Sequence, residues 1–169
     1  MRIAAVTLLA FALASTAAVA ANAPSVGTLS VEGAVGVVTV TGRGAVLGRV
    51  VSGSVRIVDV SPDDRWEPMI NGIAGIESYT LRGRNLSFRI LGGEYRIVLR
   101  GEGISLAARG RGVATIDGDS TAAAAGAAGI WSVTRDVDCR RAADQCDPVS
   151  DLQRKISFGP GAAPTGEKS

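Results

Sequence analysis

The chain has 169 residues, no histidine, and a formal net charge of +2. The absence of histidine removes Ser-His-Asp and Cys-His catalysis and most catalytic zinc sites, and the near-neutral charge argues against a nucleic-acid partner. We therefore expect a non-enzyme without cofactor or metal. Sixteen arginines against two lysines, with abundant alanine and glycine, indicate a GC-rich bacterial genome.

Residues 1–21 are predicted to form a secretory signal peptide. Arg2 precedes an apolar run from Ile3 to Leu13, and small residues follow as far as Ala21. This order is typical of a secretory signal, and the apolar run is shorter than the roughly 20 residues that span a bilayer. We expect the mature protein to be secreted or to lie in the cell envelope, without stable membrane insertion after signal removal.

Residues 22–134 are predicted to form one all-β domain. Short runs of Val, Ile, Leu and Thr alternate with glycines, and no long window repeats apolar residues with a helical period. The pattern predicts about ten short strands in an antiparallel meander. Such a sheet must protect its edges, so we expect closure as a barrel or a twisted sandwich, with a β-solenoid as the alternative.

Two related strings suggest a possible internal duplication of a hairpin. Residues 48–58 read GRVVSGSVRIV and residues 88–98 read FRILGGEYRIV. The centres Ser52-Gly53 and Gly92-Gly93 predict two-residue hairpin turns, and Gly101-Glu102 and Gly110-Arg111 predict two more. In this register Ile90 faces Tyr95, and the apolar residues of both arms share one face.

The same register places pairs of arginines opposite each other on the outer face, Arg49 with Arg56 and Arg89 with Arg96. Residues 82–111 carry seven arginines against two glutamates, a local balance of +5. These arginines predict a basic sheet face for an anionic glycan or lipid. Two alternatives remain open. The side chains could simply cover a solvated face, or the five aspartates of 136–151 could pair with them.

The long connection between the two strings is acidic. Its segment 59–67 holds Asp59, Asp63, Asp64 and Glu67 around Trp66. Paired carboxylates beside an indole are also found in glycoside hydrolases, so a hydrolase is a further alternative.

The C-terminal part begins with a predicted linker over 118–128. A predicted last strand follows over 129–134, with Trp131 in the core. Residues 135–158 are predicted to be a cysteine-containing excursion closed by a Cys139–Cys146 disulfide, as a secreted chain favours. Residues seven apart on a helix lie too far apart to be bridged, so a loop is expected there. Residues 159–169 are predicted to be disordered.

These patterns together favour a non-catalytic secreted or cell-envelope β protein. We expect it to act as a structural or interaction module, with an envelope or extracellular partner that the sequence does not identify. Binding of an anionic glycan or lipid through the basic residues Arg49, Arg56, Arg89 and Arg96 is the first alternative, and hydrolysis at 59–67 is the second.

Overall fold

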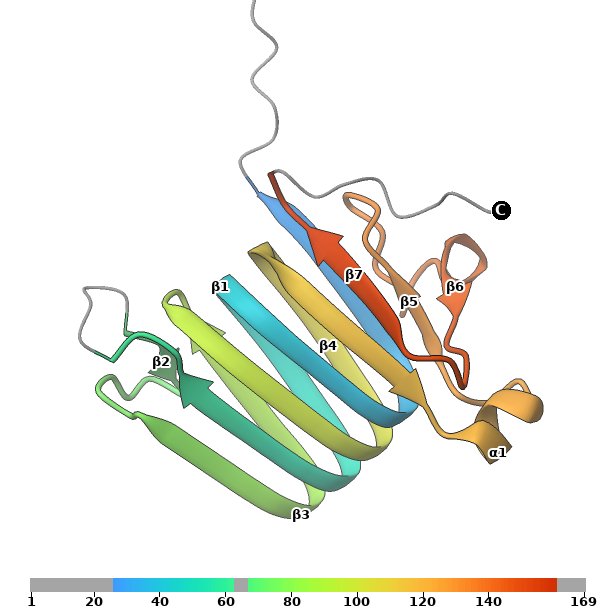
Figure 1. The fold of residues 1–169 in the computed structure, drawn as a ribbon, viewed down its shortest axis with the longest axis horizontal. Helices are drawn as coiled ribbons and strands as arrows, with labels where there is room; N and C mark the ends of the chain where they lie inside the picture. The colour runs from blue at the N-terminus through green and yellow to red at the C-terminus, as the bar shows by residue number, and fades with distance from the viewer. Residues whose placement is uncertain (1–25, 63–66, 161–169) are drawn as a thin grey trace, which may run out of the picture.

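The computed structural model describes residues 26–62 and 67–160, which form a single antiparallel sheet of seven strands (Figure 1). The strand order is β2-β3-β1-β4-β7, and β5 pairs with β1 and β6. The all-β, antiparallel prediction is confirmed, although the strands are fewer and longer than expected. The strands are β1 (Gly27–Asp59), β2 (Met69–Ile70), β3 (Ser78–Leu91), β4 (Glu94–Gly118), β5 (Ile130–Ser132), β6 (Asp147–Pro148) and β7 (Arg154–Phe158). The helical elements are α1 (Ser120–Ala124) and a 3-10 turn, Ala143–Gln145.

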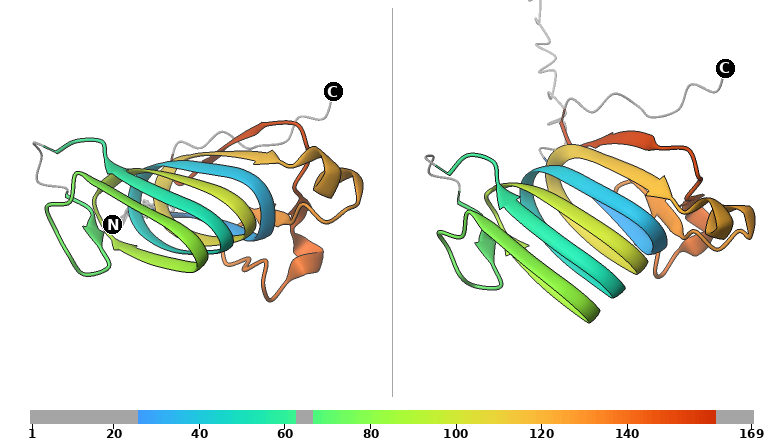
Figure 2. Two further views of the ribbon diagram at one scale, coloured as in Figure 1. Left: turned by 90° about the horizontal axis from the view of Figure 1, so that it is seen from below. Right: turned by 60° about the horizontal axis from the view of Figure 1, so that its bottom comes forward.

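The three longest strands bend sharply, so the sheet folds over on itself into two layers (Figure 2). We call the layer nearer the viewer in Figure 1 the front layer and the other the back layer. The front layer consists of residues 78–83, 53–59, 94–101, 36–44 and 110–118 in that order, followed by β7. The back layer consists of residues 84–91, 45–50, 104–109 and 27–31 in that order, followed by β5.

Glycines face glycines where the strands pass from one layer to the other. Gly53 pairs with both Gly83 and Gly101, and at the opposite corner Gly44 pairs with Gly110. A Cβ atom added at Gly53 would overlap the carbonyl oxygen of Arg100, and one added at Gly110 would overlap that of Arg43. Both glycines have positive φ, +148° and +153° respectively. The corners therefore need glycine for backbone conformation and for close approach of neighbouring strands.

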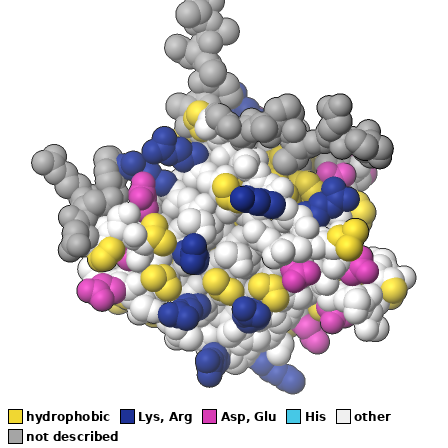
Figure 3. Space-filling view, in the orientation of Figure 1, with side chains coloured by type: hydrophobic (Ala, Val, Ile, Leu, Met, Phe, Trp, Pro, Cys, Tyr) yellow, Lys and Arg dark blue, Asp and Glu magenta, His cyan; other side chains and the backbone are white. Residues whose placement is uncertain are grey.

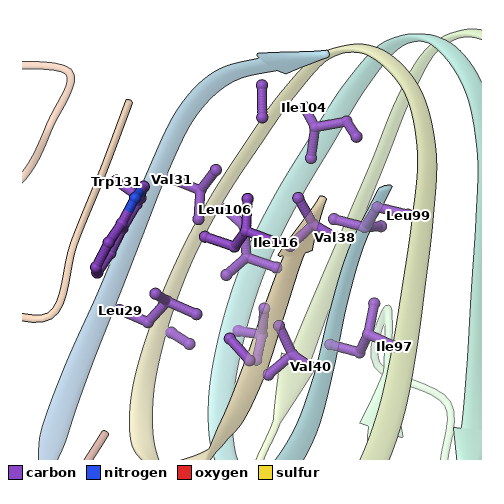
Figure 4. Packing of buried hydrophobic residues seen from close by; sticks show 14 of the residues in the cluster. Leu29, Val31, Val38, Val40, Ile97, Leu99, Ile104, Leu106, Ile116 and Trp131 are labelled. Carbon is purple, nitrogen blue, oxygen red and sulfur yellow. The ribbon is translucent and has the colours of Figure 1, made fainter. Parts of the chain in front are cut away.

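The core lies between the two layers and is filled by alternate residues of each strand (Figure 4). Val38, Val40 and Ile97 enter from the front layer, and Leu29 and Leu106 enter from the back layer. Trp131 is buried against this cluster, which confirms its predicted core position. The period-two pattern therefore assigned the inner side of residues 86–108 correctly.

The predicted hairpins are wrong. The chain continues as one strand through Ser52-Gly53, and β4 continues through both Gly101 and Gly110. At Gly92-Gly93 β3 ends and β4 begins, but the two strands do not pair. Ile90 lies opposite Val46 and Ile70 rather than Tyr95. Each repeated string crosses from the back layer to the front layer, so its two arms lie in different layers instead of pairing edge to edge.

The barrel prediction is also wrong, because β3 occupies an outer edge and the sheet does not close. The chain passes repeatedly from one layer to the other, as it does in a β-solenoid. Neighbouring strands are antiparallel here, however. The predicted signal peptide lies outside the described residues, as does all but Gly159 and Pro160 of the predicted disordered tail.

The C-terminal part follows the predictions in some respects and departs from them in others. The Cys139–Cys146 disulfide is present, with the two Cα atoms 5.9 Å apart across a loop. The strand predicted over 129–134 is β5, but it is not the last one, since β6 and β7 follow it. The predicted linker contains α1, whose N-cap Asp119 accepts hydrogen bonds from two backbone N–H groups. Within the described residues, no helix is long and apolar enough to cross a membrane.

The corner glycines generate a stability prediction. Gly53→Ala should lower the free energy of unfolding by about 4 kcal/mol or more, because the new methyl group overlaps backbone that cannot move without breaking the ladder. Gly33→Ala is the matched control. Gly33 also has a positive φ, +65°, but no atom lies within 4 Å of the position that a Cβ atom would take. Gly33→Ala should therefore lower the free energy of unfolding by only about 1–2 kcal/mol. Urea unfolding measures both, and equal losses would contradict the close-approach argument.

A second prediction concerns Tyr95, whose side chain is fully buried. Its hydroxyl has no hydrogen-bond partner among the described residues, and burial raises the pKa of its phenol. Tyr95→Phe should therefore raise the free energy of unfolding by about 1 kcal/mol, since the desolvation cost of the hydroxyl disappears. Tyr79→Phe is the control, because the Tyr79 hydroxyl accepts a hydrogen bond from Asn71 Nδ2 (3.4 Å). A destabilised Tyr95→Phe protein would show that the hydroxyl is satisfied.

Candidate binding surface

The outer face of the front layer is six strands wide. Adjacent strands lie about 4.8 Å apart, so the face extends about 24 Å across the strands. The sheet register sorts its outward side chains into rows. One row is Thr80, Arg56, Val98, Thr39, Thr115 and Lys155; the next is Ser78, Val58, Arg96, Thr41, Val113 and Ser157. Hydrogen bonds between neighbouring strands align the residues of each row. Each row therefore contains cations, hydroxyl groups and valines side by side.

This face is basic. Its seven cations exceed its two carboxylates, Glu94 and Asp117, by five charges (7 − 2 = +5). Figure 3 shows basic side chains distributed across this side of the molecule, with hydrophobic side chains and uncharged surface between them. The cations are Arg43, Arg56, Arg82, Arg96, Arg100, Arg111 and Lys155.

Two adjoining shallow depressions lie on this face. The larger, about 530 Å³, has threonines and valines on its floor and cations, Arg96 and Lys155, on its rim. The smaller, about 370 Å³, is bordered by Arg43, Glu94 and Arg111. The two share Thr41, Gly112 and Val113, so together they form one continuous groove with cations along both sides.

Polar contacts orient part of the groove. Arg96 Nε donates a hydrogen bond to Thr41 Oγ1 (3.4 Å), which aligns the guanidinium along the sheet. Arg43 Nη1 lies 3.7 Å from Glu94 Oε1, and Glu94 Oε2 accepts a hydrogen bond from Ser61 Oγ (3.1 Å). Because Glu94 is held by these two partners, its charge is partly compensated within the protein. The cations of the larger depression face no such carboxylate in its lining.

The four arginines predicted as a site are divided between the two layers. Arg56 and Arg96 lie on adjacent strands of the front face, since Arg56 pairs with Val98 and Arg96 with Val58. Arg49 and Arg89 lie on the back face, where they pair with Ser87 and Leu47. The predicted pairs Arg49–Arg56 and Arg89–Arg96 do not form, because a glycine corner separates the members of each pair and turns them to opposite sides of the molecule.

The back face has a different character. Arg89 lies opposite Leu47, Leu91 lies next along the same face, and Arg49 borders a depression of about 510 Å³. Leu47 is 57% exposed and Leu91 is 45% exposed. Exposed large apolar side chains thus accompany the arginines on the back face, whereas the front face has only valines beside its cations.

The acidic C-terminal segment does not lie over the front face. Its Cys139 backbone N–H donates to Ser30 Oγ (3.0 Å) in the back layer, and Asp138 borders the back depression. Asp138 pairs with Arg140 and Arg141 in its own segment, at 3.8 and 3.6 Å. Among the described residues, the carboxylates of this segment therefore form no ion pair with Arg56 or Arg96.

The acidic loop is described only in part. Asp59 is buried and accepts a hydrogen bond from the backbone N–H of Ser61 (2.9 Å), as expected for a turn. Asp63, Asp64 and Trp66 lie outside the described residues, so the hydrolase alternative stays a prediction. Within the described residues, no group of three or more Cys, Asp or Glu side chains could hold a metal ion.

The prediction missed several residues of the groove. Thr39 and Thr41 alternate with buried valines, a signal for an outward threonine row that period-two reading could have found. Lys155 belongs to β7, inside the segment expected to be an excursion. Its place beside Thr115 depends on pairing across about forty residues, which no local pattern reveals.

Comparison of the chain with protein-family models, with curated proteins and with solved structures finds no match. The two outer faces and their side chains are therefore the features that bear on function.

Proposed function

We propose that this chain is a non-catalytic interaction module of the cell envelope or the extracellular space, and that its front face binds an anionic glycan. The observation that carries the proposal is the groove between Arg96 and Lys155, with its threonine floor. Guanidinium and ammonium groups form charge-assisted hydrogen bonds with carboxylate, sulfate or phosphate groups. The threonine hydroxyls can donate to and accept from sugar hydroxyls.

The shape of the front face favours a polymer over a small molecule. The groove is shallow and continues from one depression into the next, and cations extend beyond it along the rows to Arg56 and Arg100. An extended chain with regularly spaced negative charges can contact several of these cations at once. Each contact is weak at an exposed site, so affinity should come from their number.

The glycan prediction is tested with a polyuronate, a sulfated glycan and a neutral glycan. The anionic glycans should bind to the secreted protein, and binding should weaken steeply between 50 and about 300 mM salt because the contacts are exposed. Arg96→Ser/Lys155→Ser should weaken binding about tenfold or more, measured by isothermal titration calorimetry.

The matched control is Arg49→Ser/Arg89→Ser, which removes the same charge from the back face. It should leave glycan binding within about twofold of the unmodified protein if the front face is the site. Equal weakening by the two double variants would show that net charge alone attracts the glycan, and would contradict the proposal.

An anionic lipid surface is the second candidate, and it fits the back face. Leu47 and Leu91 are exposed beside Arg49 and Arg89, and Met69 pairs with Leu91 at 38% exposure. Apolar side chains that enter the interface and arginines that meet lipid phosphates are the two components of peripheral membrane binding.

The lipid candidate makes its own prediction. Co-sedimentation with vesicles containing anionic phospholipid should fall about fivefold or more in Leu47→Ser/Leu91→Ser, because apolar burial is lost while charge is unchanged. Vesicles of neutral lipid serve as the control. If Arg96→Ser/Lys155→Ser reduces vesicle binding and the leucine variant does not, the lipid candidate on the back face is wrong.

A further inference from the structure

One edge of the folded sheet is open. Among the described residues, β3 pairs with β1 on one side, and on its other side only with β2 at Ile90 and Leu91. Asn71 also forms hydrogen bonds with both backbone polar groups of Arg89. The Arg89 N–H donates to Asn71 Oδ1 (2.9 Å), and the Asn71 N–H donates to the Arg89 carbonyl (2.8 Å). Asn71 also reaches the hydroxyl of Tyr79. No described strand pairs with this edge from 80 to 87, and Figure 1 shows β3 as the outermost strand at the lower left.

The core is open at the same edge. Leu81 in the front half of β3 and Leu86 in its back half both point inward, where they pack against the end of the core and stay half-exposed. The edge therefore offers apolar surface together with free backbone N–H and C=O groups. Edge strands of natural proteins usually carry charged residues that oppose pairing with another strand. In β3 these residues are Arg82 and Arg84.

Gly83 marks the place of a missing neighbour. It has the positive φ of the other corner glycines, +137°, compared with +134° at Gly101. At Gly101 and Gly53 the space beside the glycine is filled by the backbone of the next strand. At Gly83 the atom nearest to the position that a Cβ would take is Leu86 Cδ2, at 3.8 Å. The corner is thus shaped for a further strand that bends at the same point.

The edge is complementary to itself. An antiparallel register that places Leu81 opposite Leu86 of a second copy also places Leu86 opposite the second copy's Leu81. This register is centred between Gly83 and Arg84, so both strands bend at nearly the same point. On the outer side it pairs Thr80 with Ser87 and Arg82 with Asn85, and no arginine directly faces another. Inner and outer faces are both preserved, which a one-residue slip would destroy.

We propose that the edge 80–87 of β3 is a homodimer interface, in which two copies pair antiparallel about a two-fold axis and join their cores through Leu81 and Leu86. The front layer of one copy continues into the back layer of the other. A single eight-residue strand pair buries little surface, and four arginines lie near the axis, so the association is weak. A dissociation constant on the order of 10–100 µM suits an interface of this size.

The test combines sedimentation with a register-specific cross-link. Analytical ultracentrifugation of the full secreted chain, from about 1 to 500 µM, should show a reversible monomer–dimer equilibrium. Two single variants, Thr80→Cys and Ser87→Cys, change exposed outward residues, so the fold should survive. Mixed under mild oxidation, they should form a disulfide-linked heterodimer, because these positions face each other in the proposed register.

Each variant alone is the control. The two copies of residue 80 lie at opposite ends of the paired stretch, so Thr80→Cys alone should cross-link at least tenfold more slowly than the mixture. A monomer throughout the concentration range would overturn the proposal. A dimer in which Thr80→Cys cross-links to itself as fast as to Ser87→Cys would also overturn it, because the register would then be wrong.

Discussion

The contact between facing glycines at the corners is the constraint on which the structure depends. Gly53 with Gly101, and Gly44 with Gly110, bring neighbouring backbones so close that no Cβ atom fits between them. Each contact lets two paired strands bend together without losing the ladder. Three long strands thereby supply two packed layers, and a chain of modest length encloses a core dominated by Val, Ile and Leu.

The same corners create the surfaces available for binding. Between corners the paired strands lie side by side in register, so the outward side chains of each face form rows. The front face combines cations with threonines, and the back face combines arginines with exposed leucines. The C-terminal segment, held by the Cys139–Cys146 disulfide, packs beside the back layer through the hydrogen bond from Cys139 to Ser30.

Sequence patterns predicted the class of fold and the inner side of residues 86–108, but they predicted the wrong connections between strands. A glycine-containing pair such as Ser52-Gly53 between two apolar stretches is compatible with a hairpin turn and with a corner between layers. Either arrangement places Val50 and Val55 toward the core. In a hairpin the arms exchange hydrogen bonds with each other, whereas here each arm bonds to β3 and β4. That choice depends on strands distant in sequence, so local reading could not make it.

The sequence alone determined the period-two burial, the position of Trp131 in the core, and the loop that brings Cys139 to Cys146. These features follow from side-chain polarity and spacing, which act over a few residues. Only the tertiary structure decided which arginines share a surface. Outward residues on the two sides of a corner point to opposite faces of the molecule, so Arg49 and Arg56 are separated although they are only seven positions apart in the sequence. Arg96 and Lys155 border one groove because residues 94–101 of β4 and strand β7 both belong to the front layer.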